Sequence, residues 1–171
     1  MKKPAPPVIR FPQGMFPELR HRLLADLHRE TFALLLGKRT VVGDLCVIKV
    51  VEVIHPAPDD YHGQSLASLR LKREFVYRQL VRMQQQGDAD TLIDVHTHPF
   101  CLDGSAFSGV DDRDERDFMR WLDDTLDDIG YASIVLSQSD YSARVWHVQD
   151  GHPAAAAARV KTQIIAEAWP C

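Results

Sequence analysis

The pattern of apolar and polar positions divides the chain into segments of two kinds. Apolar residues that recur at helical spacing predict helices over residues 17–29, 68–86 and 110–126. An alanine-rich segment that opens with a proline predicts a final helix over 153–168. Short runs rich in apolar and β-branched residues predict strands over 31–37, 46–55, 91–98, 131–138 and 142–148, the last two forming a hairpin. Because helices and strands interleave, the expected fold is α/β, with a mixed β-sheet sandwiched by helices.

Length and proline content predict how the chain is divided. The 171 residues are enough for one domain with a sizeable buried core. Residues 1–16 contain four prolines and are expected to form an extended N-terminal arm. Residues 17–171 are then expected to form a single domain that ends with the C-terminal helix.

Charge, hydropathy and cysteine usage exclude several classes of protein. The formal net charge of −4 argues against general affinity for nucleic acid. No stretch approaches the roughly 18 uncharged apolar residues of a membrane span, and the first residues lack the apolar segment of a secretory signal. The three cysteines are an odd number without zinc-site spacing, which indicates free thiols in a reducing compartment. We therefore expect a cytoplasmic protein with neither a nucleic-acid nor a membrane partner.

Two histidines near the end of the predicted strand 91–98 are the first candidates for chemistry. His96 and His98 are two positions apart, so in a strand their imidazoles project from the same face. The loop that follows can bring Asp111, at the start of the next predicted helix, toward them. Together they offer two nitrogens and one carboxylate oxygen. A catalytic zinc ion takes three such protein ligands and keeps one position open for water.

Each candidate also has a plain structural interpretation. Two histidines on a strand are often polar residues of a solvated face. Ser108 and Asp111 have the spacing of a capping box at a helix start, which explains both without chemistry. Cys101 could be a soft zinc ligand, but a thiol with only a packing role is favoured. Glu30 stands just before the strand FALLLG, where a glutamate is usually an exposed boundary residue, yet a zinc hydrolase needs such a base.

In combination, these segments resemble the signature of the JAMM (MPN+, or JAB) metalloprotease family. The family pattern is a glutamate that opens a strand of the form E-x-x-G-[apolar]3-G, followed far downstream by H-[ST]-H-P and then by S-x-x-D. This chain has Glu30-Thr-Phe-Ala-Leu-Leu-Leu-Gly37, His96-Thr-His98-Pro99 and Ser108-Gly-Val-Asp111, in that order. The resemblance runs from about Pro17 to Val148. Two departures are the alanine in place of the first glycine and nine residues between His98 and Ser108, where the family usually has seven.

The resemblance implies a fold, a cofactor and a role for each matched residue. The implied fold is a mixed sheet sandwiched by helices, similar to the cytidine-deaminase architecture. His96, His98 and Asp111 would hold one zinc ion with a water, and Glu30 would be the general acid and base. Ser108 would donate a hydrogen bond to the developing oxyanion.

The resemblance also implies a substrate class. Members of the family cleave peptide or isopeptide bonds next to the C-terminal glycine of ubiquitin or a ubiquitin-like protein. This chain resembles the short stand-alone prokaryotic members, which occur beside E1-like and E2-like proteins, often in antiphage operons. Two alternatives remain open: a peptidase that acts on sulfur-carrier proteins or their adducts, and a zinc-free scaffold like the inactive branch of the family.

Overall fold

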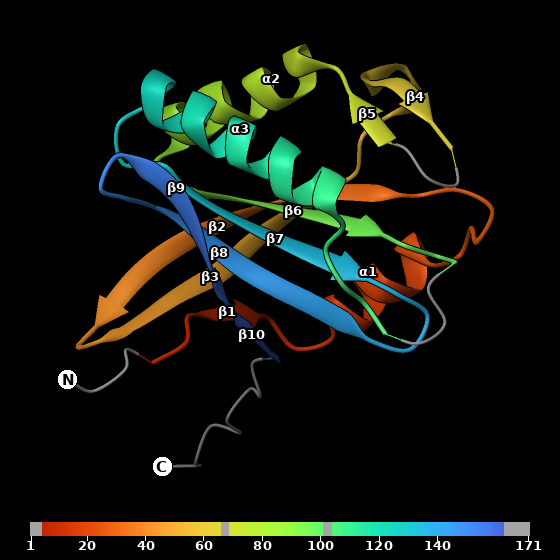
Figure 1. Ribbon diagram of the computed structural model, residues 1–171, viewed down its shortest axis with the longest axis horizontal. Helices are drawn as coiled ribbons and strands as arrows, with labels where there is room; N and C mark the ends of the chain where they lie inside the picture. Colours follow the sequence, from red (N-terminus) through yellow and green to blue (C-terminus); the bar gives the residue numbers. More distant parts are fainter. Residues whose placement is uncertain (1–4, 66–68, 101–103, 163–171) are drawn as a thin grey trace, which may run out of the picture.

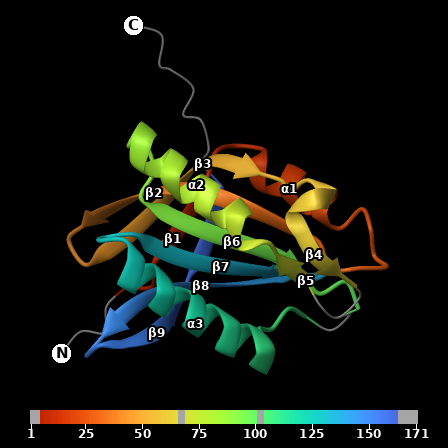
Figure 2. The same ribbon diagram turned by 90° about the horizontal axis from the view of Figure 1, so that it is seen from above.

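The structure of the protein is a computed structural model that describes residues 5–65, 69–100 and 104–162. Within these residues an eight-stranded sheet has the strand order β10-β1-β3-β2-β6-β7-β8-β9 (Figures 1 and 2). Its strands are β1 (Val8–Phe11), β2 (Phe32–Val42), β3 (Leu45–Ile54), β6 (Thr91–Thr97), β7 (Gly130–Leu136), β8 (Tyr141–Gln149), β9 (His152–Ala157) and β10 (Arg159–Thr162). A short 3₁₀ helix, η1 (Pro58–Asp60), leads into a separate two-stranded sheet of β4 (Tyr61–Gln64) and β5 (Leu69–Leu71).

The large sheet contains both parallel and antiparallel pairs. β1 is parallel to β3 and β10, and β6 is parallel to β7. The remaining neighbours are antiparallel, including β2 with β6 and the hairpin of β7 and β8. The parallel pair β6 and β7 needs a crossover, which α3 (Gly109–Thr125) provides. The expected mixed sheet and the hairpin are confirmed.

Helices cover both faces of the sheet, as expected. Side chains alternate along each strand, so neighbouring residues of β2 enter two different cores. One core packs α1 (Met15–Leu23) against the sheet and includes Phe16, Leu19, Leu23, Ala33 and Leu35. The other packs α3 and α2 (Arg73–Gln86) against the opposite face and includes Phe75, Leu80, Met83, Met119 and Leu122. In the described part of the chain, no helix combines the length and apolar character that crossing a membrane requires.

The sheet curls until its two ends approach each other. β9 and β10 lie at opposite ends of the strand order, yet only Ala158 separates them along the chain. The amide of Ala158 donates to the carbonyl of Ala143 in β8, and the amide of Arg159 donates to the carbonyl of Pro7 beside β1. The core that contains α1 therefore lies inside the curl, with side chains from both ends of the sheet.

The helix expected over 153–168 is wrong for the residues that the structure describes. His152–Ala157 form β9, which pairs antiparallel with β8, and Arg159–Thr162 form β10, which pairs with β1. The helix propensity of alanine is worth only tenths of a kcal/mol per residue, so the hydrogen bonds of an available sheet edge can override it. Residues 163–168 of the expected helix lie outside the described residues.

Two further boundaries differ from those expected. Residues 8–11 of the expected arm are extended, but they form β1 within the sheet, where Val8, Ile9 and Phe11 are buried, and α1 already begins at Met15. The folded core therefore begins before residue 17. The helix expected over 68–86 is divided, because Leu69–Leu71 pair with β4 and α2 begins only at Arg73.

Candidate metal centre

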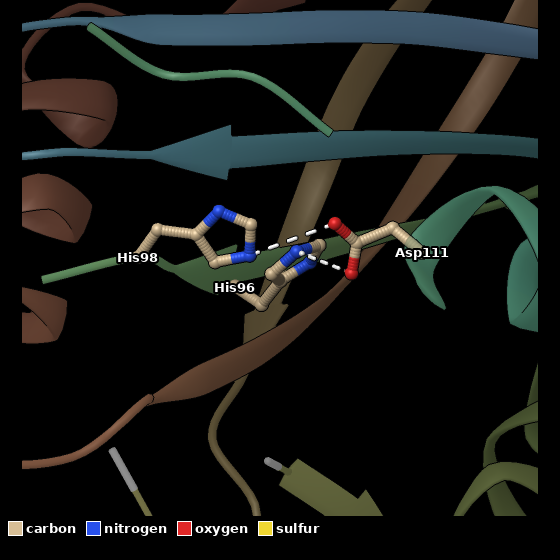
Figure 3. Close-up of side chains that lie close together, drawn as sticks. All are labelled: His96, His98 and Asp111. Atoms are coloured by element: carbon tan, nitrogen blue, oxygen red, sulfur yellow. Dashed lines mark ion pairs between the residues drawn. The ribbon is translucent and has the colours of Figure 1, made fainter. Parts of the chain in front are cut away.

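The end of β6 and the start of α3 bring His96, His98 and Asp111 together. His96 lies in β6 and His98 just beyond its end at Thr97, with both imidazoles on the face that α3 covers. Asp111 lies in the first turn of α3. Figure 3 shows its carboxylate facing both imidazole rings.

The ligand atoms of the three side chains lie close enough together to converge on one metal ion. His96 Nε2 lies 3.4 Å from Asp111 Oδ1, and His98 Nε2 lies 3.6 Å from Asp111 Oδ2. One ligand atom from each residue lies within 4.8 Å of the other two. In a tetrahedral zinc site with bonds of about 2.0–2.2 Å, neighbouring ligand atoms are about 3.3–3.6 Å apart. These residues could therefore hold a metal ion.

Burial and hydrogen bonding also fit a metal ion. The side chains of His96, His98 and Asp111 are only 12%, 7% and 16% exposed. His96 Nε2 is a buried polar atom that has no hydrogen-bond partner among the described residues. Such an atom is costly to leave unsatisfied, and a metal ion would satisfy it. Two imidazoles and a carboxylate are also a donor set that suits zinc.

The electrostatics of the site favour a positive charge. Burial lowers the pKa of His96, but the facing carboxylates of Asp111 and Asp94 outweigh burial and raise it to about 10. Burial raises the pKa of Asp111, but the contacts with His96 and Ser108 have the larger effect and hold this pKa well below its usual range. Burial and the neighbouring His96 lower the pKa of His98. Because metal ligands must be deprotonated, a bound cation would replace the proton that His96 otherwise keeps.

A capping box fixes the position of Asp111. The backbone amide of Ser108 donates to Asp111 Oδ2 at 2.5 Å, and Ser108 Oγ accepts from the amide of Asp111 at 3.1 Å. The capping role predicted for this pair is confirmed. It is compatible with chemistry, because a hydroxyl that accepts through one lone pair can still donate its proton elsewhere.

Glu30 approaches the same site from β2. Glu30 lies two residues before Phe32, the first residue of β2, which pairs with His96 in the antiparallel register of β2 and β6. The residue is only 8% exposed. Burial raises the pKa of its carboxyl, whereas the charge of His96 lowers it and that of Asp111 raises it. Glu30 is thus a buried acid beside the candidate metal ligands, not the exposed boundary residue of the structural interpretation.

The structure therefore brings together most of the residues singled out in the sequence. His96, His98 and Asp111 converge, and Glu30 lies close enough for the charges of His96 and Asp111 to shift its pKa. Ser108 lies at the rim as the cap of α3. Cys101 lies outside the described residues.

The sequence interpretation missed a set of polar residues beneath α3. Glu115 is buried and accepts hydrogen bonds from Ser133, Arg144 and Trp146. Arg144 also pairs with Asp112, and its guanidinium lies 3.7 Å from the ring centre of Phe107. These contacts tie the first turns of α3, and hence Asp111, to β7 and β8. The signal in the sequence was the spacing of Glu115, which places it on the same face of the helix as the apolar Met119 and Leu122.

A second residue missed is Asp94, which lies in β6 two positions before His96. Its Oδ1 is 3.4 Å from His96 Nδ1, the nitrogen on the other side of the ring from Asp111. The strand alternation that grouped His96 with His98 also places Asp94 on their face, so the motif Asp-Val-His-Thr-His contained this signal.

Two comparisons with known proteins bear on this arrangement. Residues 12–155 match the sequence model of the family described as prokaryotic homologs of the JAB domain. Among solved structures, the chain is similar to the solution structure of protein DSY2949 from Desulfitobacterium hafniense, with a TM-score of 0.51 and 16% sequence identity. That similarity covers 92% of this chain and 95% of the other, and at this identity it shows a shared fold alone. A search of curated proteins gave no match.

Proposed function

The chain belongs to the prokaryotic homologs of the JAB domain, and from that premise we propose that it is a zinc-dependent isopeptidase or peptidase. Its substrate is a ubiquitin-like protein with another group joined to its C-terminus, and the cut falls just after the terminal glycine. The observation that carries the proposal is the convergence of His96, His98 and Asp111, with the buried Glu30 beside them. Its partners are the ubiquitin-like protein or its conjugate and the E1-like and E2-like proteins of the same pathway, in an antiphage setting.

Hydrolysis of a peptide bond needs a water nucleophile and a group that carries its proton. A zinc ion held by His96, His98 and Asp111 would lower the pKa of a water and polarise the scissile carbonyl. The Glu30 carboxylate accepts the proton that the attacking water loses and passes it to the leaving amine as the C–N bond breaks. The water oxygen and its second proton end in the new carboxyl group, and the first proton ends on the amine, so Glu30 returns to its starting state.

Ser108 and the capping box have complementary tasks in this mechanism. The box holds the carboxylate of Asp111 toward the histidines. Ser108 Oγ accepts a hydrogen bond from the amide of Asp111. Its hydroxyl donates a hydrogen bond to the carbonyl oxygen of the substrate as negative charge develops there.

The surroundings of Glu30 suit a substrate that arrives in extended form. The backbone amide of Glu30 donates to the carbonyl of Ser65, and the Gln64 side chain donates to the Glu30 carbonyl, so β4 lies next to the proposed base. A cavity of about 520 Å³ adjoins it and includes Thr31, Phe32 and Tyr61 in its lining. An extended tail can pair with a strand such as β4, and terminal glycines let its backbone come close to a metal.

The test uses fusions of a ubiquitin-like domain to a reporter. The zinc-loaded protein should release the reporter just after the terminal glycine, and replacing that glycine with leucine should block release. A short peptide with the same scissile sequence should be a poor substrate, because it lacks the folded body that supplies binding energy. Equal cleavage of the peptide and the fusion would indicate a general peptidase. No cleavage of any fusion by zinc-loaded protein would favour the scaffold alternative.

A further inference from the structure

Asp94 is a carboxylate in an unexpected place. It lies in the middle of the large sheet, where it pairs in register with Leu34 of β2 and Ser133 of β7. Its side chain is only 14% exposed. Along the same face of β6, Leu92 is fully buried in the apolar core beneath the helices. Burial of a charge is costly unless partners compensate for it, so the partners of Asp94 indicate what it does.

The two oxygens of Asp94 have different partners. Oδ1 faces His96 Nδ1 at 3.4 Å, and Oδ2 accepts a hydrogen bond from the Tyr131 hydroxyl. Tyr131 is only 2% exposed and packs edge-on against Phe118 of α3, with ring centres 5.0 Å apart. The buried Tyr131 therefore fixes one oxygen of the Asp94 carboxylate, and the other oxygen faces the imidazole of His96.

We propose that Asp94 is a positioning residue of the metal centre, which keeps the proton of His96 on Nδ1 and leaves the lone pair of Nε2 for the metal. This inference rests on the proposed function. Both ring nitrogens of His96 face a carboxylate at 3.4 Å, and a carboxylate can only accept a hydrogen bond. Asp111 would be engaged with the metal ion, so the single N–H of a neutral imidazole would lie on the nitrogen that faces Asp94. The other nitrogen, Nε2, is the one that faces Asp111, and it has no hydrogen-bond partner in the described part of the chain. Partners of this kind fix the tautomer and orientation of metal-binding histidines.

A purely structural role would make a different prediction. On that view, Asp94 is present only to satisfy the buried hydroxyl of Tyr131. Asp94→Asn would then weaken zinc binding no more than Tyr131→Phe does, because the amide oxygen of asparagine can still accept the hydrogen bond of Tyr131. On our proposal they differ, because Tyr131→Phe leaves the carboxylate beside His96, whereas the amide of Asp94→Asn can also donate to Nδ1 and favour the wrong tautomer.

The experiment compares zinc affinity by competition with a chromophoric chelator for the wild-type protein and both variants. Urea unfolding of the metal-free proteins reports their stability separately. We expect Asp94→Asn to weaken zinc binding by about 10- to 100-fold, the range typical of such partners, and Tyr131→Phe to weaken it by much less than tenfold. Equal zinc affinity in the wild type and Asp94→Asn, or equal losses in the two variants, would overturn the positioning role alone. A wild-type protein that binds no zinc would instead overturn the proposed function, and this inference with it.

A second measurement needs no variant and so does not depend on the folding of Asp94→Asn. Long-range ¹H–¹⁵N spectra of the zinc-loaded wild-type protein identify which nitrogen of His96 carries the proton. We expect a protonated Nδ1 and zinc on Nε2. Zinc on Nδ1, with the proton on Nε2, would overturn the proposal.

Discussion

Glu30 is a carboxylate whose chemistry follows from its burial. The backbone of the residue is held by Ser65 and Gln64, so its position does not depend on contacts of the side chain. Burial is the largest influence on its pKa and raises it. A carboxyl with a raised pKa both accepts and returns a proton more readily near neutral pH, which is what the proposed hydrolysis requires.

Changing Glu30 to glutamine should separate catalysis from metal binding. The amide keeps the shape of the side chain but cannot carry a proton, so turnover of the fusion substrate should fall by about 10²- to 10⁴-fold. Zinc content should remain that of the wild type, because Glu30 is not among the three ligands. Loss of zinc from Glu30→Gln would show that Glu30 is a ligand and would contradict its role as the base.

The same variant predicts a dependence of stability on pH. In the metal-free protein the pKa of Glu30 is raised above its unfolded value, so the folded state binds this proton more tightly than the unfolded state. Its contribution to the free energy of unfolding is present below the ordinary pKa of glutamate and is lost as the pH rises through the raised value. Glu30→Gln has no such loss. The melting temperature of Glu30→Gln, relative to that of the wild type, should therefore rise between acid and neutral pH. A difference between the two that stays constant with pH would contradict the raised pKa.

Ser108 has a confirmed structural role and a proposed catalytic one, which a single variant can separate. Loss of the cap in Ser108→Ala should cost about 1 kcal/mol of stability. Loss of an oxyanion donor should lower turnover by about 10²- to 10³-fold. If the melting temperature falls while zinc-loaded turnover stays within a few-fold of the wild type, Ser108 is a helix cap only.

At the scale of residues, the candidate metal ligands were predictable from the sequence, but the residues that hold them in place were not. Strand alternation groups His96 with His98, and a helix start places Asp111, so local rules sufficed. The contact of Asp94 with Tyr131 joins two strands, and the pairing of Glu115 with Arg144 joins a helix to a strand. Such contacts depend on packing between distant segments, which no local pattern contains.

At the scale of elements, Gly37 sets how closely β2 can pack beside its neighbours. The register of β2 with β3 shifts between Leu36 and Gly37, which marks an irregularity in the pair. A Cβ atom at Gly37 would lie 2.7 Å from Ile48 Cγ2 and 3.3 Å from Ile93 Cδ1. Both isoleucines are fully buried, so neither can move aside without disturbing the core.

We therefore expect Gly37→Ala to destabilise the protein by about 1–3 kcal/mol, as overpacking of a core does. Urea unfolding measures this loss. Gly63→Ala is the matched control, because a Cβ atom there has no neighbour within 4 Å among the residues that the structure describes, and its effect should stay within about 0.5 kcal/mol. Equal stability of the two variants would show that the strands adjust to a side chain at Gly37.

The elements themselves were predicted unevenly, for one physical reason. Strands and helices with a clear period, such as β6 and α3, appear as expected. β1, β4, β5, β9 and β10 were missed because they are short or have few large apolar residues, and each exists through pairing with a partner strand. The alanine run of β9 shows this most clearly, since its local preference is helical and the edge of β8 makes it a strand.

At the scale of the whole molecule, the site exists because three distant segments meet. The antiparallel register of β2 and β6 carries Glu30 to the histidines, and the α3 crossover between β6 and β7 carries Asp111 there. The general α/β arrangement followed from the order of elements. The curl of the sheet could not be predicted, because it depends on β9 and β10 meeting opposite ends of the strand order.

The central claim is that His96, His98 and Asp111 form one metal site, and zinc stoichiometry tests it most directly. The wild-type protein, purified, stripped with a chelator and reloaded, should contain one zinc ion per chain by elemental analysis. The variant with both His96→Ala and His98→Ala should contain none while remaining folded by circular dichroism. A wild-type protein that takes up no zinc, or a double variant that retains one ion per chain, would contradict the claim.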